Sequence, residues 1–199
     1  MHRETIASRR TAAAAENPHR LAADNRAGPA PALAALRGRL VTVIDRPLNE
    51  GEWDLVRAFA RRLAREDLRL RFGHAFDVGD ELTFRRFFDV KPGIGEMSWT
   101  LDGAGAIAGI AHRIMVSRTE AEVALIVRSD LKQRGIGEFL LRHALARSAR
   151  QGLAALSASV LWENRAMLRL AAKIGYAPRE LSGGSIELVF TLGPIIAAA

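Results

Sequence analysis

The chain of 199 residues has no cysteine, one tyrosine and only five histidines. Without cysteine, disulfides, thiolate metal sites and a cysteine nucleophile are excluded. The histidines show no ligand-like spacing, so we expect no metal site. No apolar run approaches the roughly 18 residues that cross a bilayer, and the chain start lacks the apolar centre of a signal peptide. We therefore expect a cytoplasmic protein without a membrane partner and with one main domain.

Acidic residues are scarce at the N-terminal end. Residues 1–40 hold seven arginines and three acidic residues, so they contribute +4 to the formal net charge of +7. A nucleic-acid footprint would place such charge beside aromatic residues or a recognisable motif, and neither is found, so we expect no nucleic-acid partner.

Residues 1–37 lack a sustained amphipathic period and are predicted to be a disordered tail rich in alanine and arginine. A folded domain over 38–193 and a short tail over 194–199 complete the expected organisation.

Hydrophobic periodicity predicts a mixed α/β domain. The spacing favours helices after Asn49, around 68–72, over 135–150 and over 164–174. Strands are predicted at 40–44, 97–101, 106–115, 122–127, 154–161, 177–181 and 185–192. The aromatic residues of the 80–88 segment favour core packing over substrate contact. Trp53, Trp99 and Trp162 are expected in the core.

The segment from Glu122 to Glu138 carries the most chemical information. An apolar strand runs through a polar loop into a helix that opens with Gly135 and Gly137. Glycines allow the unpaired amides of a first helical turn to approach an anion, and Lys132 adds positive charge beside them, as does Arg134. Neither a Walker A loop nor a dinucleotide fingerprint fits, because Glu138 and Leu140 stand where those motifs need lysine and glycine. The glycine pair alone is equally compatible with a plain helix start.

The wider pattern distinguishes these alternatives. The strand, the segment Val127-x4-Lys132-x-Arg134-Gly135-x-Gly137, the following helix, Glu163-Asn164-Arg165 and later Gly175-Tyr176 resemble the GNAT superfamily of acyl-CoA-dependent N-acetyltransferases. The resemblance covers residues 95–192 well and 39–94 more loosely. More narrowly, the sequence resembles the acetyltransferase domain of bacterial Pat-type protein lysine acetyltransferases. It implies a mostly antiparallel central sheet with a splayed parallel strand pair, flanked by helices.

The resemblance also implies how acetyl-CoA would be bound. The residues it implicates are Ile126, Val127, Lys132, Gln133, Arg134, Gly135, Gly137, Glu138 and Asn164. The loop from Lys132 to Glu138 would hold the pyrophosphate, while the main chain at Ile126 and Val127 would pair with the pantetheine arm. Lys132 and Gln133 depart from the commonest family residues but still offer backbone amides. Asn164 is equally suited to capping its helix or to bonding the cofactor arm.

Glu122 is the candidate general base for an amine acceptor. A free lysine, with a pKa of about 10.4, is deprotonated only to about one part in a thousand near neutral pH, so a base or desolvation must assist. The alternative interpretation of Glu122 is a solvated charge at a strand end. Many family members place a tyrosine seven residues after the asparagine to protonate the thiolate, but Ala171 stands there. His112 and His143 are interpreted as structural.

The sequence thus predicts an acetyl-CoA-dependent N-acetyltransferase whose acceptor is a protein lysine. A small amine such as a polyamine or an aminoglycoside is the alternative acceptor, which a clearly acidic pocket would favour. A non-catalytic acyl-CoA sensor is a second alternative, suggested by Ala171. The sequence leaves the oligomeric state open.

Overall fold

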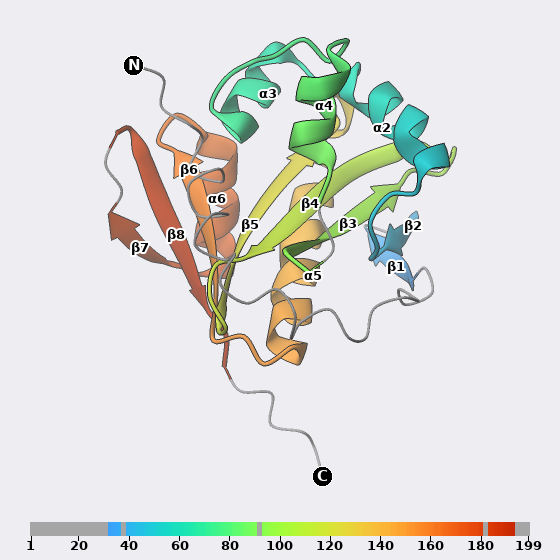
Figure 1. The fold of residues 1–199 in the computed structure, drawn as a ribbon. Helices are drawn as coiled ribbons and strands as arrows, with labels where there is room; N and C mark the ends of the chain where they lie inside the picture. The colour runs from blue at the N-terminus through green and yellow to red at the C-terminus, as the bar shows by residue number, and fades with distance from the viewer. Residues whose placement is uncertain (1–31, 37–38, 91–92, 181–182, 194–199) are drawn as a thin grey trace.

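The structure, a computed structural model, describes residues 32–36, 39–90, 93–180 and 183–193 (Figure 1). An eight-stranded sheet runs in the order β1-β2-β3-β4-β5-β6-β8-β7. Its strands are β1 (Ala32–Leu36), β2 (Arg39–Ile44), β3 (Gly95–Leu101), β4 (Ile107–Met115), β5 (Glu120–Val127), β6 (Ala155–Leu161), β7 (Ala177–Glu180) and β8 (Ser185–Thr191). All neighbouring strands are antiparallel except β5 and β6, which are parallel. The predicted fold class is confirmed.

Helices cover both faces of this sheet. They are η3 (Glu50–Glu52), α2 (Trp53–Ala60), α3 (Arg65–Phe72), α4 (Glu81–Phe88), η4 (Ser129–Leu131), α5 (Ile136–Arg150) and α6 (Arg165–Ile174). Helices α2, α3 and α4 lie together over one side, while α5 runs behind β3, β4 and β5 (Figure 1). Within the described ranges, none of the helices combines the length and the apolar character that a bilayer-spanning segment requires.

The described buried residues form three clusters, and the alternation of β5 divides its side chains among them. On β5, Ile126 packs with α2 to α4, Trp99 and Ile110, whereas Val123 packs with α5, α6 and the inner face of β6 and β8. The aromatic residues Phe84 and Phe88 of α4 are fully buried, which confirms core packing for that segment. Of the tryptophans, Trp53 and Trp99 are buried as expected. Trp162 follows the last residue of β6 and is 51% exposed. The prediction that it lies in the core is therefore wrong.

The N-terminal boundary of the domain differs from the expectation. Strand β1 lies within the segment expected to be disordered, and it pairs with β2 from Ala32 opposite Val43 to Leu36 opposite Arg39. Alanine disfavours strands on its own, but a neighbouring strand supplies main-chain partners that override so weak a preference. The remaining tail residues 1–31 and the predicted C-terminal tail 194–199 lie outside the described residues.

At the opposite end of the sheet, β7 is a short edge strand. It contains Pro178 and pairs with β8 from Ala177 opposite Val189 to Glu180 opposite Ile186. Proline has no N–H to give to a sheet ladder, so it is found in edge strands rather than central ones.

Candidate active site

A gap between two parallel strands forms the centre of the candidate site. Strands β5 and β6 pair over only three positions, from Glu120 opposite Ala155 to Glu122 opposite Ser157. Beyond that point β6 pairs with β8 along its whole length, while β5 stays paired with β4 up to Val127. The facing main-chain groups of the two strands therefore have no ladder between them, which provides hydrogen-bonding capacity for an extended ligand.

A cavity of about 390 Å³ opens from this gap toward the start of α5. Its lining comes from β5, the loop before α5, β6, α3 and α6. The predicted cofactor residues that line it are Ile126, Val127, Lys132, Gln133, Gly135, Gly137, Glu138 and Asn164. Two predicted site residues, Arg134 and Glu122, are not among the described residues that line the cavity. The side chain of Arg134 is exposed to solvent.

The loop before α5 turns through two left-handed residues. Gly135 has φ of +89° and Gln133 has φ of +60°. A β-carbon makes this region unfavourable for L-residues, so the turn requires glycine at 135 and holds some strain at 133. No side chain caps the helix at Gly135. The N–H groups of the first turn, from Ile136 onward, lack intrahelical partners and carry the positive end of the helix dipole.

The side chain of Lys132 is paired with another charged residue. Its ammonium forms an ion pair with Asp67 of α3, whose side chain is 7% exposed. The second carboxylate oxygen of Asp67 accepts a hydrogen bond from Ser129 Oγ at 2.5 Å, and Ser129 Oγ accepts one from the main-chain N–H of Ala64 at 2.8 Å. These bonds attach α3 to the loop that precedes α5.

Asn164 begins α6. Its Oδ1 accepts a hydrogen bond from the N–H of Met167 at 3.1 Å, which confirms the capping role. The residue also lines the cavity, so bonding of a cofactor arm by the same side chain stays a prediction. Glu138 lines the cavity as well, but its carboxylate binds Arg142 at 3.0 Å and also pairs with Lys173.

The buried His112 pairs with the partly buried Arg71 near Glu122. Arg71 Nη2 lies 3.1 Å from His112 Nδ1. Burial, reinforced by the charge of Arg71, lowers the pKa of His112 to about 3, so the ring is neutral and Nδ1 accepts the arginine proton. Burial lowers the pKa of Arg71 to about 10, while the charge of Glu122 acts in the opposite direction. His112 is therefore structural, as interpreted from the sequence, because its basic nitrogen is already occupied.

Glu122 lies at the closed end of the gap. It is partly buried, at the last parallel pair before β5 and β6 separate. Because strand residues alternate, Glu122, Ala124 and Ile126 share one sheet face, and His112, opposite Ala124, shares it too. Val123 and Ala124, the next residues of β5, line the cavity. Ala171, where the resemblance would place tyrosine, is fully buried in the α6 core.

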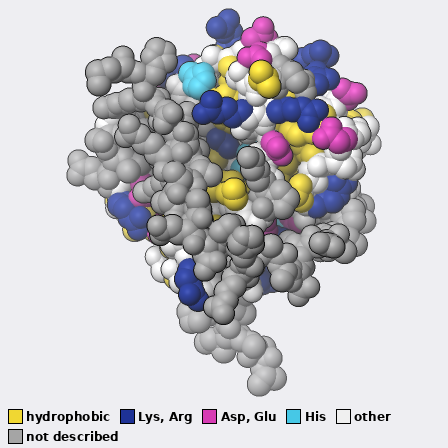
Figure 2. All heavy atoms as spheres, viewed as in Figure 1, with side chains coloured by type: hydrophobic (Ala, Val, Ile, Leu, Met, Phe, Trp, Pro, Cys, Tyr) yellow, Lys and Arg dark blue, Asp and Glu magenta, His cyan; other side chains and the backbone are white. Residues whose placement is uncertain are grey.

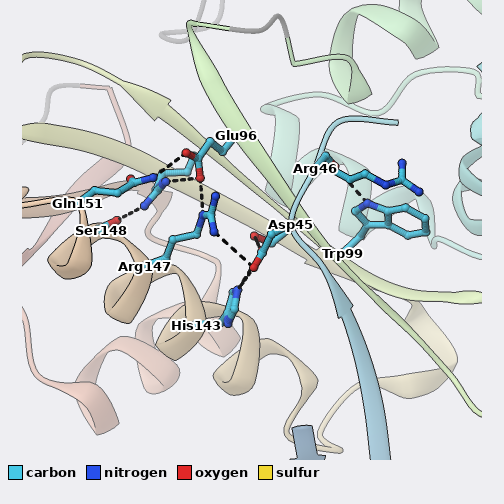
Figure 3. Close-up of polar contacts among 10 residues, drawn as sticks. Asp45, Arg46, Glu96, Trp99, His143, Arg147, Ser148 and Gln151 are labelled. Carbon is cyan, nitrogen blue, oxygen red and sulfur yellow. Dashed lines mark hydrogen bonds and ion pairs between the residues drawn. The ribbon is translucent and has the colours of Figure 1, made fainter. Parts of the chain in front are cut away.

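A polar network on the other face of the sheet fixes α5 in place (Figure 3). We call it the α5 network; its members are Asp45, Glu96, Ser98, Arg113, His143, Arg147, Ser148 and Gln151. Asp45 lies 2.8 Å from His143 Nε2 and accepts from Ser98 at 2.6 Å. Glu96 accepts from Arg147 Nε at 2.5 Å and pairs with Arg113. These contacts fix the position of α5, and with it the position of its first turn beside the cavity.

The same network keeps its carboxylates ionised. Burial alone would raise the pKa of Asp45, but hydrogen bonds from His143 and Ser98 outweigh it, and the pKa lies below its ordinary value. For Glu96, burial is likewise outweighed by Arg147, Arg113 and Gln151, and the pKa is lowered.

The described surface near the cavity is mixed in charge. Figure 2 shows basic and acidic side chains interspersed over the helices at the top of the view. The charged residues that line the cavity are Asp67, Arg71, Lys132, Glu138 and Arg169, of which the two acidic ones are paired with cations. The described part of the cavity is therefore not an acidic pocket.

Sequence reasoning missed the contribution of α3. Asp67, Leu70 and Arg71 form one wall of the cavity. Asp67 stands in the first turn of a helix, where an acidic residue is explained by the helix dipole alone. The only available signal was a basic residue, Arg71, among the apolar residues of a predicted helix face.

Comparison with known proteins agrees with this geometry. The model of the Acetyltransferase (GNAT) family matches residues 61–176. The GNAT domain of PAT from S. lividans has a TM-score of 0.72 and 21% identity, over 81% of this chain and 97% of that chain. Spermidine N-acetyltransferase from Vibrio cholerae, in complex with CoA and spermine, has a TM-score of 0.60 and 16% identity, over 75% and 95%. A cAMP-binding acyltransferase from Mycobacterium smegmatis has a TM-score of 0.54 and 22% identity, over 84% of this chain and 49% of that one.

Proposed function

This chain belongs to the GNAT family of acetyltransferases, and we propose that it transfers the acetyl group of acetyl-CoA to a lysine side chain of a protein. The main support for acetyl-CoA binding is the gap between β5 and β6, from which the cavity extends to the first turn of α5, at Gly135 and Gly137. Main-chain groups of Ile126 and Val127 would pair with the pantetheine arm. Amides around Gly135 and Gly137, with Lys132, would bind the pyrophosphate.

The choice of a protein lysine rests on two observations. The described cavity lining holds no surplus of acidic residues, whereas a polyamine with several positive charges would be recognised by such a surplus. The similarity to the PAT GNAT domain, which is greater than that to the spermidine enzyme, supports the same choice. A single lysine ammonium needs only one carboxylate, and Glu122 directly precedes the cavity-lining residues Val123 and Ala124.

In the proposed reaction, the neutral lysine nitrogen attacks the thioester carbonyl carbon and the C–S bond breaks. Glu122 takes the proton of the attacking amine, directly or through one water, which typically contributes about 10²- to 10⁴-fold. The CoA thiolate leaves without an acid at position 171, because a thiol with a pKa of about 8.5 is a tolerable leaving group near neutral pH. Positioning and a main-chain N–H near Val127 supply the remaining stabilisation.

The first test measures release of free thiol from acetyl-CoA with a panel of proteins and small amines. Glu122→Gln is expected to lower kcat about 10²-fold or more while leaving CoA affinity unchanged. Glu120→Gln is the matched control, because Glu120 lies two residues earlier on the same strand face and pairs with Arg179 instead. Full turnover in Glu122→Gln would remove that residue as the base. Turnover with polyamines alone would replace the proposed acceptor, and CoA binding without turnover on any acceptor would indicate a sensor.

The second test addresses the loop. Gly135→Asp is expected to abolish CoA binding, because it adds a side chain and a negative charge where the phosphates would lie. Gly152→Asp is the matched control: Gly152 has φ of +78° and open space around it, and it lies at the far end of α5. Both variants carry similar backbone strain, so only the first should lose CoA in calorimetry. Normal CoA affinity in Gly135→Asp would contradict the assignment of this loop.

A further inference from the structure

Asp67 is a carboxylate in the cavity wall that acetyl transfer does not require. It stands on α3, yet both of its oxygens bind the segment between β5 and α5: one pairs with Lys132 Nζ and the other accepts from Ser129 Oγ at 2.5 Å. Its side chain is 7% exposed, and both Asp67 and Lys132 line the cavity. A buried negative charge therefore lies where the proposed function places a doubly charged diphosphate.

The two anions would share one cation. Lys132 is the lysine that the proposed function assigns to the pyrophosphate, but in the structure its ammonium is bound to Asp67. A diphosphate entering the loop would either draw the ammonium away from Asp67 or share it, and in both cases it would approach a carboxylate of like charge. Each arrangement weakens binding compared with a loop in which position 67 is neutral.

We propose that Asp67 is a positioning residue that lowers the affinity of the loop for the diphosphate of acetyl-CoA and CoA, by holding Lys132 and by its own charge. The inference rests on the proposed function, because it requires the diphosphate to bind in this loop. Its consequence is an easier exchange of product CoA for fresh acetyl-CoA. The hydrogen bond to Ser129 keeps the carboxylate in place, so the effect is built into the contact between α3 and the loop.

The test is Asp67→Asn, which removes the charge but keeps an oxygen for the Ser129 hydroxyl. Calorimetry with CoA should show about three- to tenfold tighter binding, the effect of one unit charge several ångströms away at an intermediate dielectric. The KM for acetyl-CoA should fall by a similar factor. The KM for acetyl-pantetheine, a thioester without the diphosphate, should not change, and a merely structural role would not produce this contrast.

Asp54→Asn on α2 is the matched control. Its carboxylate is 88% exposed and pairs with Arg57 at 2.8 Å, away from the cavity, so the same change of charge should leave CoA affinity unaltered. Thermal unfolding of each variant checks the fold. Should the amide at 67 prevent folding, Asp67→Ser removes the same charge with a shorter side chain and carries the same test.

Unchanged or weaker CoA affinity in folded Asp67→Asn would overturn the inference, as would an equal change in the KM for acetyl-pantetheine. The variants Lys132→Met and Gly135→Asp distinguish failure of the inference about Asp67 from failure of the proposed function. Loss of CoA affinity in those two variants, without a gain in Asp67→Asn, would refute only the role of Asp67. Unaltered CoA affinity in those two variants would refute the loop assignment itself.

Discussion

Two groups of polar and charged side chains lie on opposite faces of β4. His112 and Arg113 are neighbours on this strand, so their side chains point to opposite sides of the sheet. Arg113 belongs to the α5 network, while His112 belongs to a group on the cavity side that we call the α3 cluster: Asp67, Arg71, His112 and Lys132. In the α5 network, the carboxylates of Asp45 and Glu96 each accept from at least two donors.

The α3 cluster is less completely satisfied. Arg71 Nε is buried and has no hydrogen-bond partner among the described residues, whereas the His112 ring also interacts with the main chain of Phe88. Buried polar atoms without partners are costly, so they are uncommon in a purely structural cluster and more frequent where a ligand is expected. The comparison suggests that the α5 network stabilises the fold, whereas the α3 cluster gives up stability in favour of the site.

Removing the central carboxylate of the α5 network should have the largest effect. Glu96→Ala leaves Arg113 and Arg147 without their shared partner, and we expect a loss of about 3 kcal/mol in the free energy of unfolding. Denaturant unfolding measures it. Glu50→Ala is the control, since Glu50 is 85% exposed and pairs with Arg85 only at 3.5 Å. Equal stability of Glu96→Ala and Glu50→Ala would mean that the network does not stabilise the fold.

Acid should weaken the α5 network and lower the free energy of unfolding by less than Glu96→Ala does. The pKa values of Asp45 and Glu96 are lowered in the folded protein from ordinary values of 3.8 and 4.5. Their contribution is therefore complete above about pH 5 and is lost as the pH falls through the folded values. Denaturant unfolding between pH 7 and pH 3 should show a shallower dependence in the double variant Asp45→Asn, Glu96→Gln. An unchanged slope would exclude these two groups as the cause.

Arg71→Met should destabilise the protein much less than Glu96→Ala. Burial already disfavours the charge of Arg71, and an apolar side chain of similar length removes that cost, but His112 Nδ1 loses its donor. We expect the free energy of unfolding to change by no more than about 2 kcal/mol in either direction. Thermal and denaturant unfolding measure this difference. If Arg71→Met instead destabilises the protein as much as Glu96→Ala, the distinction between the two groups disappears.

Asn164→Ala should have the smallest effect on stability. Loss of the cap on α6 costs about 1 kcal/mol. Asn164→Ser restores a capping oxygen without the amide, so it should recover stability. CoA affinity should fall in both variants, because Asn164 also lines the cavity. Normal affinity in the serine variant would leave capping as the only role of this residue.

Local patterns in the sequence predicted much of this architecture. The helix after the loop was expected over 135–150 and is found at Ile136–Arg150, because Gly135 marks its start and an apolar stripe continues to its end. The resemblance to the GNAT superfamily pointed to the loop from Lys132 to Glu138. All of these residues except Arg134 line one cavity, although their binding roles stay predictions.

Contacts distant in sequence could not be predicted. Asp67 and Lys132 are separated by 65 positions, and only the packing of α3 beside the loop brings them together. The same holds for Asp45 and His143, which lie 98 positions apart. Strand β1 was missed because its alanines carry no alternation, and its pairing with β2 is a tertiary contact.

The proline of β7 has a consequence for how copies of this protein meet. An unpaired strand edge can recruit another chain and start aggregation. Pro178 removes a donor from the outermost strand, and the charged Arg179 and Glu180 follow it, in a strand of only four residues. A second polypeptide would find neither a continuous row of donors nor an apolar surface there, so this border of the sheet resists growth into fibres.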